Sequence, residues 1–262
     1  MSATSNAYSV CWLGNAGWLL RIGPLRVLID PDLADSPSRK TLAGIPEDCI
    51  TGADAVLITH EHGDHFDIST AKRLADQSSC RFVLPASCMY AAYKAGIPEN
   101  RIISAHHGKP ITPFGEGFAI TPVPAIHGHI MGSIYKHYNA ADCGYLVTAI
   151  GITLFHPGDS VLLDEHFSLP AIDILTVSPT EHNTNIAQSL TLIEKLNPCY
   201  IFPQHRDTYY ETDDNRFWTH AYDKELFHAL PEPFKAKARY HILSQGQEYV
   251  IGGMNNVSIF SA

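Results

Sequence analysis

Short apolar runs alternate with turn residues along the first third of the chain. The runs are five or six residues long, and Gly14–Gly17 and Gly23-Pro24 separate them, which predicts a β-meander. The predicted strands are Tyr8–Leu13, Trp18–Ile22 and Leu25–Ile29. A loop rich in Pro, Ser and Asp, Leu33–Pro46, then precedes the apolar run Ala53–Ile58. Because this loop is long, we expect it to be functional rather than connective.

The rest of the chain mixes helical periodicity with further strand-like runs. Ile186–Leu196 carries apolar residues at helical spacing and stops at Asn197-Pro198, and Asp213–Leu230 carries a similar apolar stripe. The other predicted helices are Ser69–Ser78 and Ala86–Ala95. The other predicted strands are Arg81–Leu84, Ile102–Ser104, Phe118–Val123, Gly144–Ala149, Ile152–Phe155, Ile172–Val177 and Cys199–Phe202. This order predicts an α/β fold made of two similar halves that face each other.

Composition narrows the class of protein. With 262 residues, of which 45% are hydrophobic and 17% charged, the chain can bury a large core, and we expect one domain over residues 1–262. The net charge is −9 and no run is rich in Lys or Arg, which argues against nucleic acid or an anionic membrane as a partner. The sequence has no 18-residue apolar run and no signal-peptide pattern. We therefore expect a cytoplasmic protein, without membrane insertion, that acts on a small molecule.

The six cysteines are scattered and form no C-x-x-C pair. Such a distribution argues against a zinc knuckle or a redox dithiol. We expect all six to be small buried residues in a reducing compartment.

The run His60–His65 is the strongest chemical signal in the chain. It places three histidines and Asp64 within six positions, directly after an apolar run. The composition of the chain predicts only about 0.003 chance matches to the pattern H-x-H-x-D-H. Imidazole and carboxylate are common ligands of divalent metals, so this run predicts a metal site. In an extended chain His60, His62 and Asp64 share one side while His65 points elsewhere, so one segment can serve two metals.

Three further segments place histidine or aspartate directly after a predicted strand. They are Ala125–His129, His156–Ser160 and Phe202–His205. Strand ends hold side chains rigidly, so these segments are candidate sources of ligands. His127 and His129 lie on the same side of an extended chain, and either is a candidate. Asp159 has two oxygens that can bridge two cations, whereas we expect His156 to be a strand-edge or supporting residue.

Other histidines and aromatic residues have weaker contexts. Asn185 and Gln188 have the spacing of a helix cap, which leaves His182 as a candidate pocket residue. His106 and His107 are expected to be solvated turn residues. The residues that follow His205 are expected mostly to pack a helix, although two of them are close enough in sequence to line a cleft. The packing residues are Tyr210, Phe217, Trp218 and His220, and the two possible cleft residues are Arg206 and Tyr209.

Together these motifs resemble those of metallo-β-lactamase-fold hydrolases, and within them the branch that contains L-ascorbate-6-phosphate lactonase. The matching segments are Trp12–Gly17, Leu28–Pro31, Thr59–His65, Pro124–His127, Gly158–Ser160 and Pro203–His205. The resemblance implies a four-layer αββα sandwich, with two facing mixed β-sheets flanked by helices.

The resemblance also implies a ligand set for two divalent metal ions. His60, His62 and His127 would bind the first ion, Asp64, His65 and His205 the second, and Asp159 would bridge them. Asp30 matches an aspartate behind the ligands and is expected to hold an imidazole N–H. The ligand types suit Zn or Mn, and Fe is a third option. Flavodiiron relatives carry Glu at the position of His62, so a redox role is disfavoured.

The chemistry expected of such a centre is hydrolysis by a hydroxide held between two cations. Asp64 is expected to orient this nucleophile or to shuttle its proton, and His182 or His129 to assist the leaving group. The expected substrate is a small polar lactone or carboxylic ester. A phosphodiester is the alternative substrate class, and a non-catalytic metal- or ligand-binding sensor on the same fold is the alternative from another class.

Overall fold

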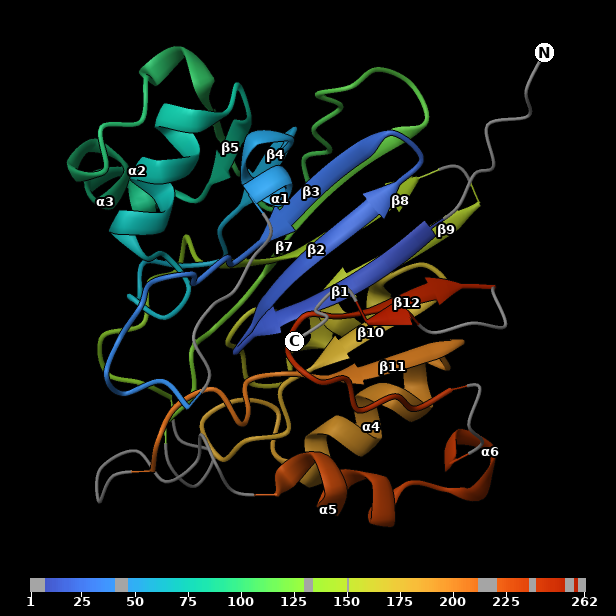
Figure 1. Cartoon of the computed structure of the whole chain (residues 1–262). Coiled ribbons are helices and arrows are strands. Elements are labelled where there is room, and N and C mark those ends of the chain that lie inside the picture. Colours follow the sequence, from blue (N-terminus) through green and yellow to red (C-terminus); the bar gives the residue numbers. More distant parts are fainter. Residues whose placement is uncertain are drawn as a thin grey trace. The chain divides into compact units, whose positions relative to one another are not determined.

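The structure of the chain is a computed structural model (Figure 1). It describes residues 8–40, 47–129, 134–149, 151–211, 221–235, 239–252 and 257–258. The contacts of the chain divide it into two compact units. Unit 1 comprises Met1–Leu84, Cys88–Ser104 and Leu243–Ala262, and unit 2 comprises Pro85–Ser87 and Ala105–Ile242. A single domain over residues 1–262 stays a prediction.

Unit 1 is built on an eight-stranded mixed sheet in the order β13-β12-β1-β2-β3-β4-β5-β6. Figure 1 labels β1 to β5 and β12 of this sheet. The strands are β1 (Tyr8–Gly14), β2 (Gly17–Ile22), β3 (Leu25–Ile29), β4 (Ala55–Leu57), β5 (Arg81–Leu84), β6 (Ile102–Ser104), β12 (Gln247–Ile251) and β13 (Val257–Ser258). The pairs β1–β2 and β2–β3 are antiparallel, which confirms the predicted meander. The strands from β3 to β6 are parallel.

The helices of unit 1 follow the parallel strands, because parallel neighbours need a crossover connection. These helices are α1 (Glu47–Thr51), α2 (Ile68–Gln77) and α3 (Met89–Lys94), with the 3₁₀ turn η2 (Glu99–Arg101). The 3₁₀ turn η1 (Ala86–Cys88), just before α3, belongs mostly to unit 2. The Asp67 carboxylate caps α2 by accepting the N–H of Thr70 at 2.6 Å. Ile50, Leu74 and Ala92 from the three helices share a core with the sheet residues Leu28, Val56 and Phe82. The helices predicted at 69–78 and 86–95 are confirmed, whereas α1 was not predicted.

Unit 2 is built on a five-stranded mixed sheet in the order β11-β10-β9-β8-β7. The strands are β7 (Phe118–Pro124), β8 (Cys143–Ala149), β9 (Ile152–His156), β10 (Ile174–Val177) and β11 (Tyr200–Pro203). The first three are antiparallel, and β9, β10 and β11 are parallel. The connections and the covering layer contain η4 (Asp164–Ser168), α4 (Ile186–Leu196), α5 (Tyr222–Ala229) and α6 (Glu232–Lys235).

The helices of unit 2 pack on this sheet through one apolar core. Leu192 and Ile193 of α4 and Leu226 of α5 share the core with Phe155 and Leu175. The predicted helix Ile186–Leu196 is confirmed with the same bounds. Of the predicted helix Asp213–Leu230, the part from Tyr222 is helical, and residues 212–220 lie outside the described part of the chain. Phe217, Trp218 and His220 belong to that stretch.

Both units therefore carry a mixed sheet in which an antiparallel run, β1–β3 or β7–β9, leads into parallel strands, as the prediction of two similar α/β halves requires. Unit 1 adds the antiparallel strands β12 and β13 at the end of its chain. The carboxyl ends of parallel neighbours meet at one edge of a sheet. In unit 1, Asp30 follows β3 and His60 comes shortly after β4. In unit 2, Asp159 follows β9, and His182 and His205 follow β10 and β11. The topology thus gathers chemically active residues at one sheet edge in each unit.

Two further predictions have different outcomes. Five of the six cysteines are buried, but Cys199 is exposed, so the prediction for Cys199 is wrong. It stands just before β11, in the surface connection from α4. No helix in the described ranges is long and apolar enough to cross a bilayer.

Candidate metal centre

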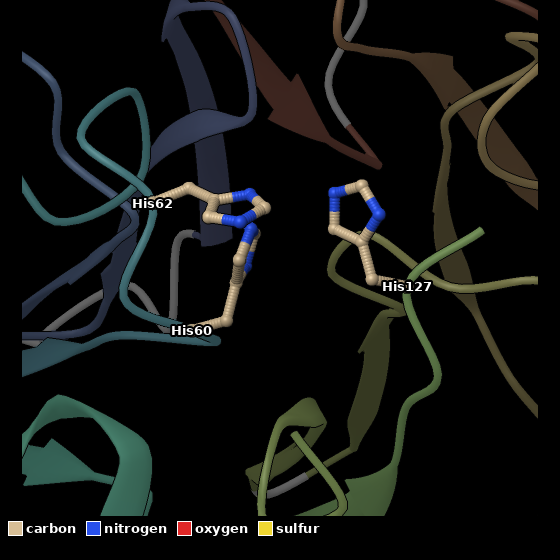
Figure 2. A group of neighbouring side chains, drawn as sticks. All are labelled: His60, His62 and His127. Atoms are coloured by element: carbon tan, nitrogen blue, oxygen red, sulfur yellow. The ribbon is translucent and has the colours of Figure 1, made fainter. Parts of the chain in front are cut away.

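In unit 1 the candidate ligands lie on the turn after β4. The rings of His60 and His62 meet edge to face with centroids 4.6 Å apart, and Figure 2 shows this pair. The His65 ring lies 4.1 Å from that of His60, so the prediction that His65 points elsewhere is wrong. The chain is not extended here, because the N–H groups of His65 and Phe66 both bond to the carbonyl of His62. This turn brings all three rings together.

Asp30 holds two of these rings from behind. Its Oδ2 lies 2.8 Å from His65 Nδ1 and accepts the Thr59 hydroxyl at 2.6 Å. The Thr59 hydroxyl in turn lies 3.0 Å from His60 Nδ1. Both histidines therefore engage Nδ1 with supporting groups and have Nε2 as the atom for coordination. The predicted role of Asp30 fits this geometry, whereas the part played by Thr59 was not predicted.

Asp64 lies beside His65 at the spacing of two ligands that share one ion. Its Oδ2 is 3.5 Å from His65 Nε2. Metal–ligand bonds of about 2.0–2.2 Å in a tetrahedral site hold donor atoms about 3.3–3.6 Å apart. The residues of unit 1 therefore fit a bound divalent metal both in chemistry and in spacing.

In unit 2 three imidazoles surround one buried carboxylate oxygen. Asp159 Oδ2 lies 3.1 Å from His205 Nε2, 3.5 Å from His127 Nε2 and 3.8 Å from His182 Nε2. The donor atoms of Asp159, His182 and His205 all lie within 4.8 Å of one another. A buried carboxylate surrounded by imidazole nitrogens is a donor set that suits a divalent cation.

Strand pairing and a tight turn hold the unit 2 residues in place. His156 Nδ1 accepts the N–H of Gly158 at 3.1 Å, which fixes the turn before Asp159 and matches the supporting role expected of His156. The N–H of Ile126 bonds to the Ser160 hydroxyl at 3.1 Å, and the N–H of Val161 bonds to the carbonyl of Ile126 at 2.9 Å. These bonds tie the segment that carries His127 to the turn that carries Asp159.

The structure distinguishes the two histidines that the sequence left open. His127, also drawn in Figure 2, donates Nδ1–H to the carbonyl of Gly128 at 2.6 Å and presents Nε2 to Asp159. His129 is exposed and stacks on Tyr135. Gly128 is required between them, because a Cβ there would collide with the carbonyl of His182. His127 is therefore the member of this pair that joins the Asp159 cluster.

Of the remaining candidate residues, the structure places some at the Asp159 cluster and others elsewhere. Asn185 caps α4 by accepting the N–H of Gln188 at 3.1 Å, and His182, just before this cap, joins the cluster. Arg206 is buried and lies 3.5 Å from Asp223 of α5, with which it forms an ion pair; a place for Arg206 in a cleft stays a prediction. Burial also lowers the pKa of the Arg206 guanidinium. His106 and His107 are exposed, as predicted.

Sequence reasoning missed a second polar contact of unit 1, besides those of Thr59. The side-chain amide of Asn15, from the β1–β2 turn, donates to Asp64. The signal was a lone asparagine between Gly14 and Gly17, which is typical of a turn with positive φ, but nothing local ties that turn to a residue so far along the chain.

Comparison with known proteins agrees with the donor chemistry. The family described as "Beta-lactamase superfamily domain" matches residues 9–205, a range that includes every candidate ligand. A UPF0173 metal-dependent hydrolase of Thermococcus kodakarensis is 32% identical over 208 residues, which are 76% of this chain and 85% of that protein.

Solved structures agree on the fold. Igni18, a metallo hydrolase of Ignicoccus hospitalis, has a TM-score of 0.70 at 19% identity and covers 93% of this chain and 98% of its own. An isothiocyanate hydrolase from Delia radicum gut bacteria has a TM-score of 0.69 at 17% identity, with 92% and 98% covered. The narrower resemblance to the lactonase branch stays a prediction. The chain belongs to the beta-lactamase superfamily and, within it, to the UPF0173 metal-dependent hydrolases.

Proposed function

We propose that this metal-dependent hydrolase opens a lactone, or cleaves another carboxylic ester, of a small polar molecule with the help of two divalent metal ions. The observation that carries the proposal is the position of Asp159 Oδ2, which lies 3.1–3.8 Å from the Nε2 atoms of three histidines. A carboxylate with two oxygens is suited to bind two cations at once. Such a bridge distinguishes a hydrolytic centre from a structural metal site, whose ligands enclose one ion completely.

The proposed ligand set is the one that the motif resemblance implies. His60, His62 and His127 would hold one ion, Asp64, His65 and His205 would hold the other, and Asp159 would contact both. The engagement of Nδ1 in His60, His65 and His127 supports this set, because each ring then has Nε2 for the metal. The metal is proposed to be Zn or Mn, with Fe as the third option.

Bound divalent ions would lower the pKa of a water molecule towards neutrality and polarise the carbonyl of the substrate. Asp64 takes a proton from the attacking water on a carboxylate oxygen. The water oxygen bonds to the carbonyl carbon, and the C–O bond to the alcohol or ring oxygen breaks. His182 gives a proton to that oxygen from Nε2, so the product is an acid and an alcohol, or one hydroxy acid from a lactone.

The assignment of His182 as the proton donor rests on its surroundings. Its Nε2 lies 3.8 Å from Asp159, and its ring centroid is 4.9 Å from that of His205. His129, the other candidate donor, is exposed. The ester class rests on the motif resemblance to the lactonase branch. The likeness to an isothiocyanate hydrolase supports a reaction in which water attacks an electrophilic carbon.

The test combines metal analysis with a substrate panel. Purified protein is assayed for metal by plasma mass spectrometry, and its rates are compared on lactones, nitrophenyl esters and bis-nitrophenyl phosphate. Asp159→Asn should lose metal and at least about 100-fold in rate, whereas Asp76→Asn, which alters an exposed pair with Lys72, should change neither.

Absence of bound metal, or a wild-type rate for Asp159→Asn, would overturn the proposal. Faster turnover of the phosphodiester than of every ester would replace it with the phosphodiesterase alternative. If the metal-loaded protein binds small molecules tightly but does not turn them over, the alternative of a non-catalytic ligand-binding sensor would replace the proposed hydrolase.

A further inference from the structure

The turn between β1 and β2 carries an amide that is bonded to a proposed metal ligand of the same unit. Asn15 Nδ2 lies 2.9 Å from the backbone carbonyl of Asp64 and 3.0 Å from its Oδ2. Asn15 is fully buried. One amide group therefore holds both the backbone and the carboxylate of Asp64, although 49 positions separate the two residues in sequence.

The turn itself is built so that this amide has little freedom. Asn15 has a φ of 47° and Gly14 a φ of 104°, a combination that asparagine and glycine tolerate better than other residues. The indole N–H of Trp12 donates to the carbonyl of Asn15 at 2.9 Å. Gly17 packs closely, because a Cβ there would lie 3.1 Å from the carbonyl of Asp30. These contacts hold the backbone of the turn, and with it the point from which the short Asn15 side chain projects.

The contact decides where the Asp64 carboxylate points. The Asp64 side chain is one-quarter exposed, and its Oδ2 stands between the Asn15 amide and His65 Nε2, which is 3.5 Å away. A partly exposed carboxylate without a fixed partner can rotate away from its neighbour, and a donated N–H opposes that rotation. A metal site requires its ligands to be held in place before the ion arrives.

We propose that Asn15 is a positioning residue that holds the Asp64 carboxylate in place for metal binding. The inference rests on the proposed role of Asp64 as a ligand. Asn15 acts only through Asp64 and needs no contact with metal or substrate.

The test measures the affinity of the full chain for Zn²⁺ or Mn²⁺ by competition with a chelator. Asn15→Gly removes the amide and tolerates the positive φ, and Asn15→Asp keeps the shape but replaces the donor with a second carboxylate. Asn197→Gly is the matched control, because Asn197 also has a φ of 47° and accepts a hydrogen bond from Arg239 at 2.8 Å. We expect Asn15→Gly to weaken metal binding about 10–100-fold, Asn15→Asp to weaken it further, and Asn197→Gly to leave it unchanged.

The relative metal affinities of Asn15→Gly and Asn15→Asp show whether Asn15 positions the Asp64 carboxylate or only shapes the turn. If Asn15 only shapes the turn, Asn15→Asp should behave like the wild type, because aspartate tolerates positive φ. Metal binding by Asn15→Asp as tight as that of Asn15→Gly, or tighter, overturns the inference. The melting temperature of the metal-free protein shows whether Asn15→Asp folds. If it does not fold, the metal affinities of Asn15→Gly and Asn197→Gly are compared instead. Equal affinities in these two variants overturn the inference.

Asp64→Asn separates the inference from the proposed function. Wild-type metal content and affinity in Asp64→Asn would contradict the proposed ligand set, and the inference would fall with it. Loss of metal in Asp64→Asn, together with wild-type affinity in both Asn15 variants, would overturn the inference alone.

Discussion

In unit 1 the four proposed ligands lie within six residues of one turn, whereas in unit 2 the three proposed ligands His127, Asp159 and His205 follow three different strands, β7, β9 and β11. The turn of unit 1 depends on partners brought in from behind, namely Asp30, Thr59 and Asn15. The cluster of unit 2 depends on the pairing of its strands and on close backbone packing. Two similar sheets thus hold similar donors in different ways, one through hydrogen bonds to side chains and the other through close backbone packing.

The largest effect is expected at the residue proposed to bind both ions. Asp159→Ala should remove nearly all bound metal and lower the rate at least about 1,000-fold, whereas His62→Ala should lower metal content by about half. Plasma mass spectrometry and rate measurements on the same samples check this difference. Equal metal loss in the two variants would break the distinction between a bridging residue and a single-site ligand.

The partner behind the unit 1 turn should have the next largest effect. Asp30→Asn keeps the size of the side chain and tolerates the positive φ of 43°, but an amide no longer offers His65 and Thr59 a charged acceptor. We expect metal affinity to fall about 10–100-fold, as is typical of residues that orient ligands. Chelator competition measures the change. Asp173→Asn, which alters a carboxylate that accepts the Thr153 N–H at 2.7 Å, is the control and should keep wild-type affinity.

Close backbone packing can be tested by adding one methyl group to each unit, with a Gly→Ala substitution. A Cβ at Gly128 would collide with the carbonyl of His182, whereas a Cβ at Gly63 meets no atom within 4 Å. Gly128→Ala should lower the free energy of unfolding by about 1–3 kcal/mol, the usual cost of an overpacked site, and Gly63→Ala should change it little. Urea unfolding of the metal-free variants compares them. Similar losses in both variants would show that the two units do not differ in this respect.

The smallest effect concerns pH and belongs to unit 2. His166 is fully buried against Phe155 and the carbonyl of Pro124, and burial lowers its pKa from 6.5 to about 4. The unfolded chain therefore binds a proton that the folded protein does not, so stability falls as the pH drops from about 6.5 towards 4 and levels off below. Between pH 7 and pH 6 this group should cost about 0.7 kcal/mol.

Hydrogen exchange can locate this pH effect. Amides of β7 and β9 should lose protection on acidification sooner than those of β2 and β3, and His166→Gln should reduce the difference. The same pH dependence in wild type and His166→Gln would remove His166 as its cause.

Regular elements and ligands were predictable from the sequence for different reasons. Strands such as Leu25–Ile29 and the helix Ile186–Leu196 are confirmed because apolar periodicity reports burial directly. The helix α1 and the strand β12 were missed, since five residues of mixed polarity carry little periodic signal. The side on which His65 lies was predicted wrongly because the extended-chain argument fails inside a turn.

The ligands were recognisable because metal chemistry restricts the residue types, but the residues that hold them were mostly not. Asp30 was expected only through family resemblance. The contacts of Asn15 and Thr59 arise from folding, since the bond from Asn15 joins two turns that are distant in sequence. Local patterns contain no information about such pairs.

The order of strands in unit 1 also has a consequence for synthesis on the ribosome. β12 pairs with β1, Ile251 lying opposite Tyr8, yet all of unit 2 separates the two strands in sequence. The outer edge of β1 therefore has no β12 to pair with until the ribosome has translated unit 2. An open strand edge invites pairing with other chains, and vectorial folding leaves this edge open for most of translation. Nascent chains halted before Gln247 are thus the form of this protein most prone to aggregate.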